Sequence, residues 1–273
     1  MPLTTVQEGR VYDWSHAVGR NAARGPGFNY IQTMCLGKNS VLYATNRGNE
    51  NNFGMHVNKV QLGGPGDEEH VADFCEYGEG DGKCTWPFGV AVDNNDHVYV
   101  SDDWQNTISV FDSSGKFLMK FGQYGKIEEP EGAYAVTMLG PYITAGEETG
   151  GYPKPGMLNH PTDVAVDTDG DIYVADWGNH RISVFDSEGK PVCHLIGDAQ
   201  VLSKWGQQTV DANPDMAKAR RRVRSLEPQW RFCFPTAVEF DPATDQIIVA
   251  DGQRNRLQVY KKVRDYSDFQ ANL

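Results

Sequence analysis

The feature that most limits what this chain can fold into is a sequence pattern that occurs three times at one fixed spacing. Each copy opens with an aromatic residue or a histidine followed by proline, at Trp86-Pro87, His160-Pro161 and Phe234-Pro235. The prolines are 74 residues apart in both intervals (161 − 87 and 235 − 161). Self-similarity at a fixed interval is typical of repeat architectures, in which each copy is one supersecondary unit.

Each copy contains three runs rich in β-branched residues, separated by turns of Asp, Asn and Gly. Such turn residues tolerate a positive φ or cap their own backbone, which suits β-hairpins. In two copies a fourth run follows, at residues 116–122 and 190–197. Four antiparallel strands form a propeller blade, and neighbouring blades must stack because a single blade cannot bury both of its faces. The pattern therefore predicts an all-β fold, a β-propeller.

The copy around residues 159–182 resembles a known family. It reads Asn-His-Pro-Thr-Asp-Val-Ala-Val-Asp at 159–167, then Tyr-Val-Ala-Asp at 173–176 and Gly-Asn-His-Arg-Ile at 178–182. This is similar to the NHL repeat, which is named for an Asn-His-Leu signature, and Asn179-His180-Arg181 occupies the signature position. The resemblance extends to three copies clearly and to a fourth loosely, and it implies an NHL-repeat β-propeller.

Four blade-like copies are recognisable, at about residues 28-62, 85-122, 159-197 and 233-260. A blade needs only ~40 residues, so the spacing leaves two inserts, at 123-158 and 198-231. We expect residues 1-273 to form a single propeller domain whose inserts complete or decorate the ring. Because propellers of this family usually close with six blades, six-bladed closure with degenerate blades is the alternative. The last copy lacks an outer strand, and residues 9-14 are expected to supply it.

Composition bears on partners and on the compartment. With 37 acidic and 25 basic residues the net charge is −12, which disfavours nucleic acid and anionic membranes as partners. No apolar stretch reaches the ~20 residues that cross a bilayer, and the first eight residues lack a signal-peptide pattern. The five cysteines include no CxxC pair, so we expect reduced thiols and a cytoplasmic location. The expected partner is a protein or a small-molecule ligand, and a homo-oligomer remains open.

The candidate binding residues fall in loops that share one face of the predicted propeller. Binding residues concentrate on loops carried by a rigid scaffold, and Trp and Arg dominate interaction hot spots. Trp104, Trp177, His180 and Arg254 lie in the loops that follow the second run of each copy. They predict a ligand- or protein-binding module that uses this loop face and the central channel. The alternative is that the tryptophans cover the seams between blades.

A second hypothesis is a metal-dependent lyase or hydrolase with its site at the channel mouth. His56, His160 and His180 resemble in placement the histidines of zinc-bearing amidating-lyase propellers. Three neutral imidazoles would leave Zn²⁺ an open position for water. Histidine does not recur at the matching positions of the other copies, so structural roles are favoured. The cofactor is left unknown, with zinc or calcium under this hypothesis.

Calcium would follow the example of lactonase-type propellers, which hold Ca²⁺ with acidic residues in the channel. A calcium site needs several carboxylate or carbonyl oxygens. The residues expected at the channel are not acidic; they are Gln32, Phe88, Thr162 and Thr236. The sequence therefore disfavours a calcium site at these positions.

Two further features have structural interpretations. Asp102, Asp176 and Asp251 recur at the end of the second run, which predicts a repeated hydrogen bond, with Arg181 and Arg256 as partners of the last two. The second insert contains a helix signal from residue 213, with an N-cap, a proline and an acidic residue in the first turn. One helix face is apolar and the other basic, and we expect the apolar face, including Met216, to pack on the propeller and the basic face not to bind RNA.

Overall fold

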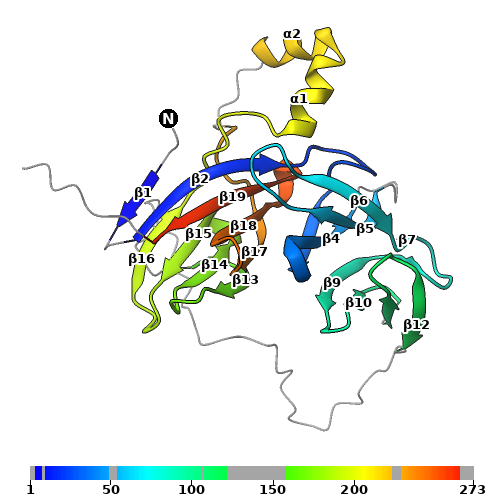
Figure 1. Ribbon diagram of the computed structural model, residues 1–273. Helices are drawn as coiled ribbons and strands as arrows, with labels where there is room; N and C mark the ends of the chain where they lie inside the picture. The colour runs from blue at the N-terminus through cyan, green and yellow to red at the C-terminus, as the bar shows by residue number, and fades with distance from the viewer. Residues whose placement is uncertain are drawn as a thin grey trace, which may run out of the picture.

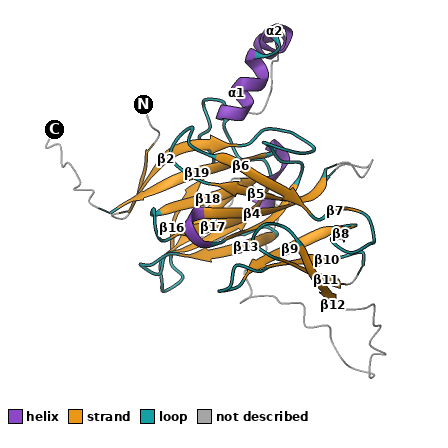
Figure 2. Ribbon diagram, turned by 45° about the vertical axis from the view of Figure 1, so that its right-hand side comes forward, coloured by secondary structure: helices purple, strands orange, loops and turns teal. Residues whose placement is uncertain are grey.

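The computed structural model describes residues 4–7, 10–48, 54–105, 107–121, 158–222 and 229–264. Within these ranges the chain consists mainly of β-strands, in four antiparallel sheets arranged in a row like the blades of a propeller (Figure 1, Figure 2). The all-β propeller predicted from the repeat is confirmed, with four blades in the described part of the chain.

Three of the sheets have four strands in sequence order. The first sheet contains β3 (Ile31–Leu36), β4 (Val41–Arg47), β5 (Met55–Gln61) and β6 (Glu69–Phe74). The second contains β9 (Pro87–Val92), β10 (Val98–Asp102), β11 (Thr107–Phe111) and β12 (Phe117–Phe121). The third contains β13 (Pro161–Val166), β14 (Ile172–Asp176), β15 (Arg181–Phe185) and β16 (Pro191–Leu195). A short parallel pair, β7 (Glu76–Tyr77) and β8 (Lys83–Cys84), precedes the second sheet.

The fourth sheet joins the two ends of the chain. It contains β17 (Pro235–Asp241), β18 (Gln246–Asp251), β19 (Arg256–Val263), β2 (Arg10–Val18) and β1 (Thr4–Gln7). β2 is antiparallel to β19, with Val18 opposite Leu257 and Trp14 opposite Tyr260. The outer strand of this sheet is thus N-terminal, and it extends beyond the residue 14 at which the predicted strand ends.

The inner strands of neighbouring sheets lie side by side, in the order β13, β17, β3 and β9. The third and second sheets therefore stand at the two ends of the row (Figure 1). Apolar side chains fill the interfaces between neighbours, for example Tyr173 with Val238, Ile31 with Ile248, and Tyr43 with Val100. Each such buried side chain contributes about 1.5–3 kcal/mol to folding.

A buried cluster of charged side chains links the fourth sheet to the third. It lies on the side of the propeller opposite the loops that carry the candidate binding residues. The Lys262 ammonium on β19 lies 2.9 Å from Asp171, 2.8 Å from Asp169 and within hydrogen-bonding distance of Asp167. Arg10 on β2 pairs with Asp171 at 2.7 Å. Because Lys262, Asp167 and Asp171 are buried, each charge depends on its partners for stabilisation.

The second insert joins two sheets that are already neighbours, so it decorates the row and adds no blade. It contains α1 (Lys204–Asp211) and α2 (Pro214–Arg222), which project from the sheets in Figures 1 and 2. α1 is anchored by Trp205, which is buried in the core, and by the Ser203 cap. α2 differs from expectation, because Met216 is 44% exposed and does not pack on the propeller.

The remaining boundaries differ from the expected ones in two places. The first copy continues past residue 62, because its fourth strand is β6. Most of the first insert, residues 122–157, lies outside the described residues. None of the helices in the described ranges is long and apolar enough to span a membrane.

Candidate functional site

The start of each inner strand is held by one repeated hydrogen bond. In the third and fourth sheets the carboxylates of Asp176 and Asp251 accept the backbone N–H groups of Asn159 and Cys233, both at 2.7 Å. Asp102 accepts the N–H of Thr85 in the second sheet, and in the first sheet Asn46 accepts that of Asn29 at 2.8 Å. The three aspartates end a second strand, Asn46 is the last residue but one of its second strand, and all four acceptors are buried, which confirms the structural role predicted for the aspartates.

The predicted arginine partners are also confirmed. Arg181 Nε donates to Asp176 at 2.8 Å, and Arg256 Nε donates to Asp251 at 2.8 Å. In the first sheet, position 181 corresponds to His56, because His56 lies opposite Asn46 as Arg181 lies opposite Asp176.

An aromatic residue or a histidine directly precedes each inner strand. We call Tyr30, Trp86, His160 and Phe234 the pre-strand residues. The face of the propeller on which they lie, which runs across all four sheets, is called the loop face. Three of them, Tyr30, His160 and Phe234, have a left-handed φ between 50 and 55°. Such values are uncommon for bulky residues, so the neighbouring hydrogen bonds must enforce them. The result is a line of ring side chains along the loop face.

Each of the three described seams between sheets is bridged at the loop face by residues from its two sides. Trp177 stacks on Phe234 with ring centroids 4.4 Å apart, and the Asn255 side chain accepts the N–H of Tyr30 at 2.8 Å. The Arg47 guanidinium lies 4.7 Å from the Trp86 ring centroid. The sequence left two interpretations of Trp177, a binding residue or a cover over the seam between two blades. The structure places Trp177 over the seam between the third and fourth sheets.

Trp104 is placed differently from Trp177. It lies on Trp86 of its own sheet, with ring centroids 5.1 Å apart, and 58% of its surface is exposed. Arg47, Trp86 and Trp104 thus form one group on the loop face, called the stack, in which the two indole rings meet edge to face and Trp104 is outermost. Arg254, the fourth candidate, is half-buried in the short 3₁₀ helix Gly252–Arg254.

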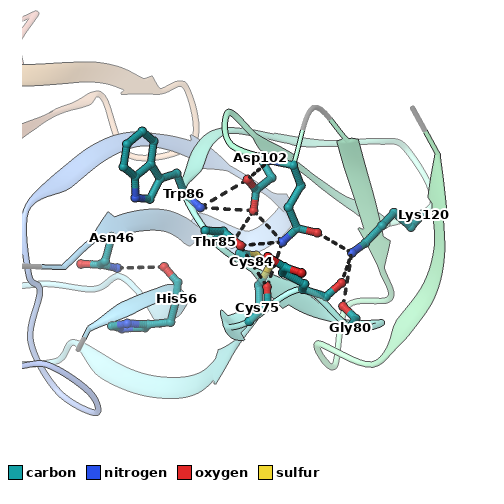
Figure 3. Close-up of a disulfide and its surroundings, with 12 residues drawn as sticks. Asn46, His56, Cys75, Gly80, Cys84, Thr85, Trp86, Asp102 and Lys120 are labelled. Carbon is teal, nitrogen blue, oxygen red and sulfur yellow. Dashed lines mark hydrogen bonds between the residues drawn. A yellow bond between two sulfur atoms is a disulfide. The ribbon is translucent and has the colours of Figure 1, made fainter. Parts of the chain in front are cut away.

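The loop beneath this stack is closed by a disulfide between Cys75 and Cys84 (Figure 3). The expectation of reduced thiols was wrong for this pair, because the parallel pairing of β7 with β8 brings the two residues together. Cys35, Cys193 and Cys233 are free. Beside the disulfide loop, Lys120 donates to Gly80 O at 3.2 Å and to Gln105 at 2.9 Å (Figure 3).

The three histidines of the metal hypothesis do not converge. His56 is buried in the first sheet, where its Nδ1 lies 2.8 Å from Gly54 O, and burial lowers its pKa. His160 and His180 lie on the loop face against Trp177 and Phe234, respectively. In the described part of the chain, no three His, Cys, Asp or Glu side chains gather as a metal site would require.

Two acidic residues on neighbouring inner strands escaped the sequence reasoning. Asp163 on β13 accepts the N–H of Val238 on β17 at 3.0 Å, and burial raises its pKa. Burial, and secondarily the charge of Asp163, raises the pKa of Glu239 on β17 to about 7. The Cys35 thiol on β3 also has a raised pKa, because of burial and then of the Glu239 charge. On the same two strands, the hydroxyls of Thr162 and Thr236 donate to carbonyls of the next sheet, at Pro235 and Ile31.

The pre-strand residues were also missed as a set. Trp86 and Phe234 marked the start of their copies in the sequence, but no role at a binding surface was predicted for them. The signal available was their common position, one residue before each inner strand.

The family comparison matches one of the repeats. The model of the NHL repeat matches residues 158–185, the pre-strand segment and first three strands of the third sheet. Among curated proteins, "Protein brain tumor" of Drosophila melanogaster is 30% identical over 146 residues, which are 47% of this chain and 14% of that protein. "Peptidylglycine alpha-amidating monooxygenase" of Rattus norvegicus is 28% identical over 193 residues, 63% of this chain and 17% of that protein. The chain thus spans a small part of the curated relatives it matches.

Among solved structures, a virginiamycin B lyase from Staphylococcus aureus is 14% identical, with a TM-score of 0.26 over 93% of this chain and 60% of that one. The match and the strand order together show an NHL repeat at residues 158–185, within a chain that folds as a β-propeller.

Proposed function

We propose that this protein is a binding module that recognises a protein segment or a small ligand with the loop face of its propeller. The observation that carries the proposal is the stack of Arg47, Trp86 and Trp104, in which the outermost ring is 58% exposed. Trp and Arg side chains are enriched at hot spots, because they offer a large rigid contact area together with hydrogen-bond donors.

The surroundings of the stack support recognition by a rigid surface. Trp86 N–H donates to Asp102 at 3.2 Å, and Asp102 also accepts from the backbone N–H of Trp104 at 3.0 Å. Gln105 Nε2 donates to the same carboxylate at 3.2 Å and to the Thr85 hydroxyl at 3.0 Å, and the backbone N–H of Thr85, next to Cys84, also donates to Asp102. A ligand that stacks on Trp104 would therefore meet side chains whose backbone is already fixed, which lowers the entropic cost of binding.

A selection from a random-peptide library tests this proposal. Peptides are selected on the wild-type protein and counter-selected on Trp104→Ala, and their affinities are measured by calorimetry. We expect peptides that bind the wild type and lose about tenfold or more in affinity on Trp104→Ala, as for a hot spot. Val201→Ser, an exposed change elsewhere, should leave the affinities unchanged. Peptides that bind Trp104→Ala as well as the wild type would contradict the proposal.

The metal-dependent lyase or hydrolase is the second proposal, and the similarity to the amidating monooxygenase is the observation that favours it. Of its three histidines, His160 and His180 share the Trp177–Phe234 surface, but His56 is buried in the first sheet, so the geometry of the described residues does not support a three-histidine site. Elemental analysis of the purified protein distinguishes the two proposals, since an enzyme of this kind requires stoichiometric zinc or calcium.

We further propose that residues 1–273 act as one domain that binds no nucleic acid. A cytoplasmic location also stays a proposal. The Cys75–Cys84 disulfide weighs against it, because disulfides persist mainly in oxidising compartments. Alkylation of the unreduced protein, isolated in the presence of a thiol-blocking reagent, would report whether this pair is oxidised where the protein resides.

A further inference from the structure

The Arg47 guanidinium on the loop face has no carboxylate partner in the described part of the chain. It lies 4.7 Å from the Trp86 ring centroid and forms no hydrogen bond or ion pair with another described residue. Other arginines of the chain are paired with carboxylates; these are Arg10, Arg24, Arg181, Arg256 and Arg264. A guanidinium presents five N–H donors in a planar fork that matches a carboxylate. The donors of Arg47 can therefore serve an anion from outside the chain.

Arg47 occupies a seam position at which another sheet carries a tryptophan. It directly follows the acceptor of the repeated hydrogen bond in the first sheet, as Trp177 does in the third. Each side chain contacts the pre-strand ring of the next sheet, Trp86 or Phe234. Because Trp177 bridges its seam without a charge, packing alone does not require the charge of Arg47. The Arg47 N–H donates to Tyr30 O at 3.0 Å, so this charge is presented from a fixed backbone.

Arg47 and the exposed Trp104 are close enough to contact one ligand together. They lie 4.7 and 5.1 Å from the Trp86 ring centroid, so they are at most about 10 Å apart. An extended peptide advances about 3.3–3.6 Å per residue, so two or three residues cover this distance. Trp104 is 58% exposed, and an exposed indole offers contact area to a prolyl or aromatic ring. The stack thus presents a surface for a ring beside a donor for an anion.

We propose that the stack binds a protein segment in which an aspartate or glutamate lies within three positions of a proline or an aromatic residue. Trp104 contacts the ring, and Arg47 pairs with the side-chain carboxylate in a bidentate geometry. This inference rests on the proposed function as a binding module, and it names the chemistry of the partner.

The charges around the stack suit one carboxylate and do not suit a polyanion. The Asp102 carboxylate accepts the backbone N–H of Trp86 (Figure 3) and that of Trp104, so it does not neutralise Arg47. The net charge of −12 is screened beyond about 8 Å at physiological salt, whereas a carboxylate on Arg47 is in direct contact. RNA binds through several phosphate contacts, and the stack offers one cation.

Parallel selections on the wild type and on Arg47→Glu test the proposal. The library is a random-peptide library on beads, in which attachment blocks the C-terminus, so that only side-chain carboxylates can pair. Wild-type binders should carry Asp or Glu within three positions of a proline or aromatic residue. Binders of Arg47→Glu should carry Lys or Arg there instead. If Arg47 had only a structural role, its substitution would weaken binding without reversing this preference.

Calorimetry on one wild-type binder isolates the contact. Arg47→Gln keeps a planar polar group but removes the charge, and should weaken binding about tenfold or more. Replacing the peptide's acid by its amide should cost as much on the wild type and little on Arg47→Gln, because the two changes remove one contact. Arg47→Lys retains the charge without the fork, so its loss should be intermediate. Arg222→Gln changes an exposed arginine on α2 and should leave the affinity unchanged.

The outcomes distinguish this inference from the function on which it rests. Peptides that require Trp104, show no acidic preference and bind Arg47→Gln as tightly as the wild type would overturn the inference alone. If no peptide requires Trp104, both the inference and the binding module are refuted. Single-stranded RNA that binds the wild type and is lost on both Trp104→Ala and Arg47→Gln would overturn the inference in favour of nucleic acid. If Arg47→Glu does not fold, the calorimetry on Arg47→Gln decides.

Discussion

Nδ1 of His180 accepts a hydrogen bond from the backbone N–H of Phe234 at 3.2 Å and so joins the third sheet to the fourth. The next seam uses the same device, with Asn255 accepting the N–H of Tyr30. Both acceptors have a left-handed φ, 54° for His180 and 51° for Asn255. His180 thus makes the same hydrogen bond between neighbouring sheets that Asn255 makes at the next seam. This equivalence supports a structural role for the histidine of the repeat signature.

The contact between His180 and Phe234 predicts different losses of stability for two substitutions of His180. His180→Ala removes the acceptor and the ring that stacks on Phe234, and should cost about 1–2 kcal/mol of unfolding free energy. His180→Asn keeps an acceptor and tolerates the left-handed backbone, so it should cost about half as much. Thermal unfolding followed by circular dichroism measures both. Equal losses in the two variants would show that the hydrogen bond to Phe234 contributes nothing.

Glu239 predicts a pH-dependent stability. Its pKa is raised from 4.5 to about 7, mainly by burial and then by Asp163, so the folded state favours the protonated form. The benefit of that preference is full below pH 4.5 and is lost as pH rises toward 7. Glu239→Gln should therefore raise the free energy of unfolding at pH 8 by up to about 3 kcal/mol and change it little at pH 4. Denaturant titrations at the two pH values measure this, with exposed Glu188→Gln as control. A stabilisation of equal size at both pH values would refute the assignment.

Substitution of Lys262 should lower the free energy of unfolding more than substitution of most other residues between the third and fourth sheets. Lys262→Met removes the ammonium from Asp167, Asp169 and Asp171. Leaving buried carboxylates without their cation should cost about 3–5 kcal/mol. The neighbouring Lys261→Met changes an exposed residue and should cost less than about 0.5 kcal/mol. Urea denaturation compares the two variants, and similar midpoints would contradict the buried cluster.

Removal of the N-terminal strand should open the fourth sheet. Deletion of residues 1–15 takes away most of β2, including Tyr12, which is buried between the third and fourth sheets. We expect a large fall in Tm, because β19 becomes an unpaired edge. Deletion of residues 1–9 removes β1 but retains β2, and serves as the control. A 1–15 deletion that melts at the wild-type temperature would exclude β2 as a stabilising strand.

The fold was predictable because its determinants are local. Runs rich in β-branched residues and turn residues are visible in each copy separately and define the strands, and Asp102, Asp176 and Asp251 recur in three of the four copies and define the anchoring bonds. The candidate site was only partly predictable, since its contacts join different blades. Trp177 and Phe234 are far apart in sequence, and nothing local to Trp177 shows which residue its ring meets.

The disulfide and the acidic residues Asp163 and Glu239 on the inner strands could not be predicted for the same reason, since their contacts depend on how separate segments pack. Cys75 and Cys84 meet because β7 and β8 pair in parallel. Each of these strands has only two residues, which is too short for the pairing to be predicted from the sequence. Glu239 stands in its blade where Ala165 stands in another, so its burial beside Asp163 follows from packing between blades. Trp104 was singled out correctly as a surface residue, but its partner Trp86 was not.

The basic segment of α2 gives the last prediction, because there the local charge opposes the net charge of −12. Single-stranded RNA binds proteins through phosphate neutralisation together with stacking of bases on aromatic rings. The rings near this segment are already engaged. Trp205 and Phe232 are buried in the core, and the Arg231 guanidinium lies 5.1 Å from the Trp230 ring centroid.

We therefore expect no appreciable RNA binding at physiological salt. A gel-shift titration with single-stranded RNA at ~0.15 M salt measures this, since surface electrostatics are then screened beyond about 8 Å. The control replaces the arginines at 220, 221, 222 and 224 by serine. Micromolar binding by the wild type that is lost in this variant, with a salt slope near −0.7 per phosphate contact, would show that the basic segment is a nucleic-acid site. Binding that survives the four substitutions would place an RNA site elsewhere on the propeller.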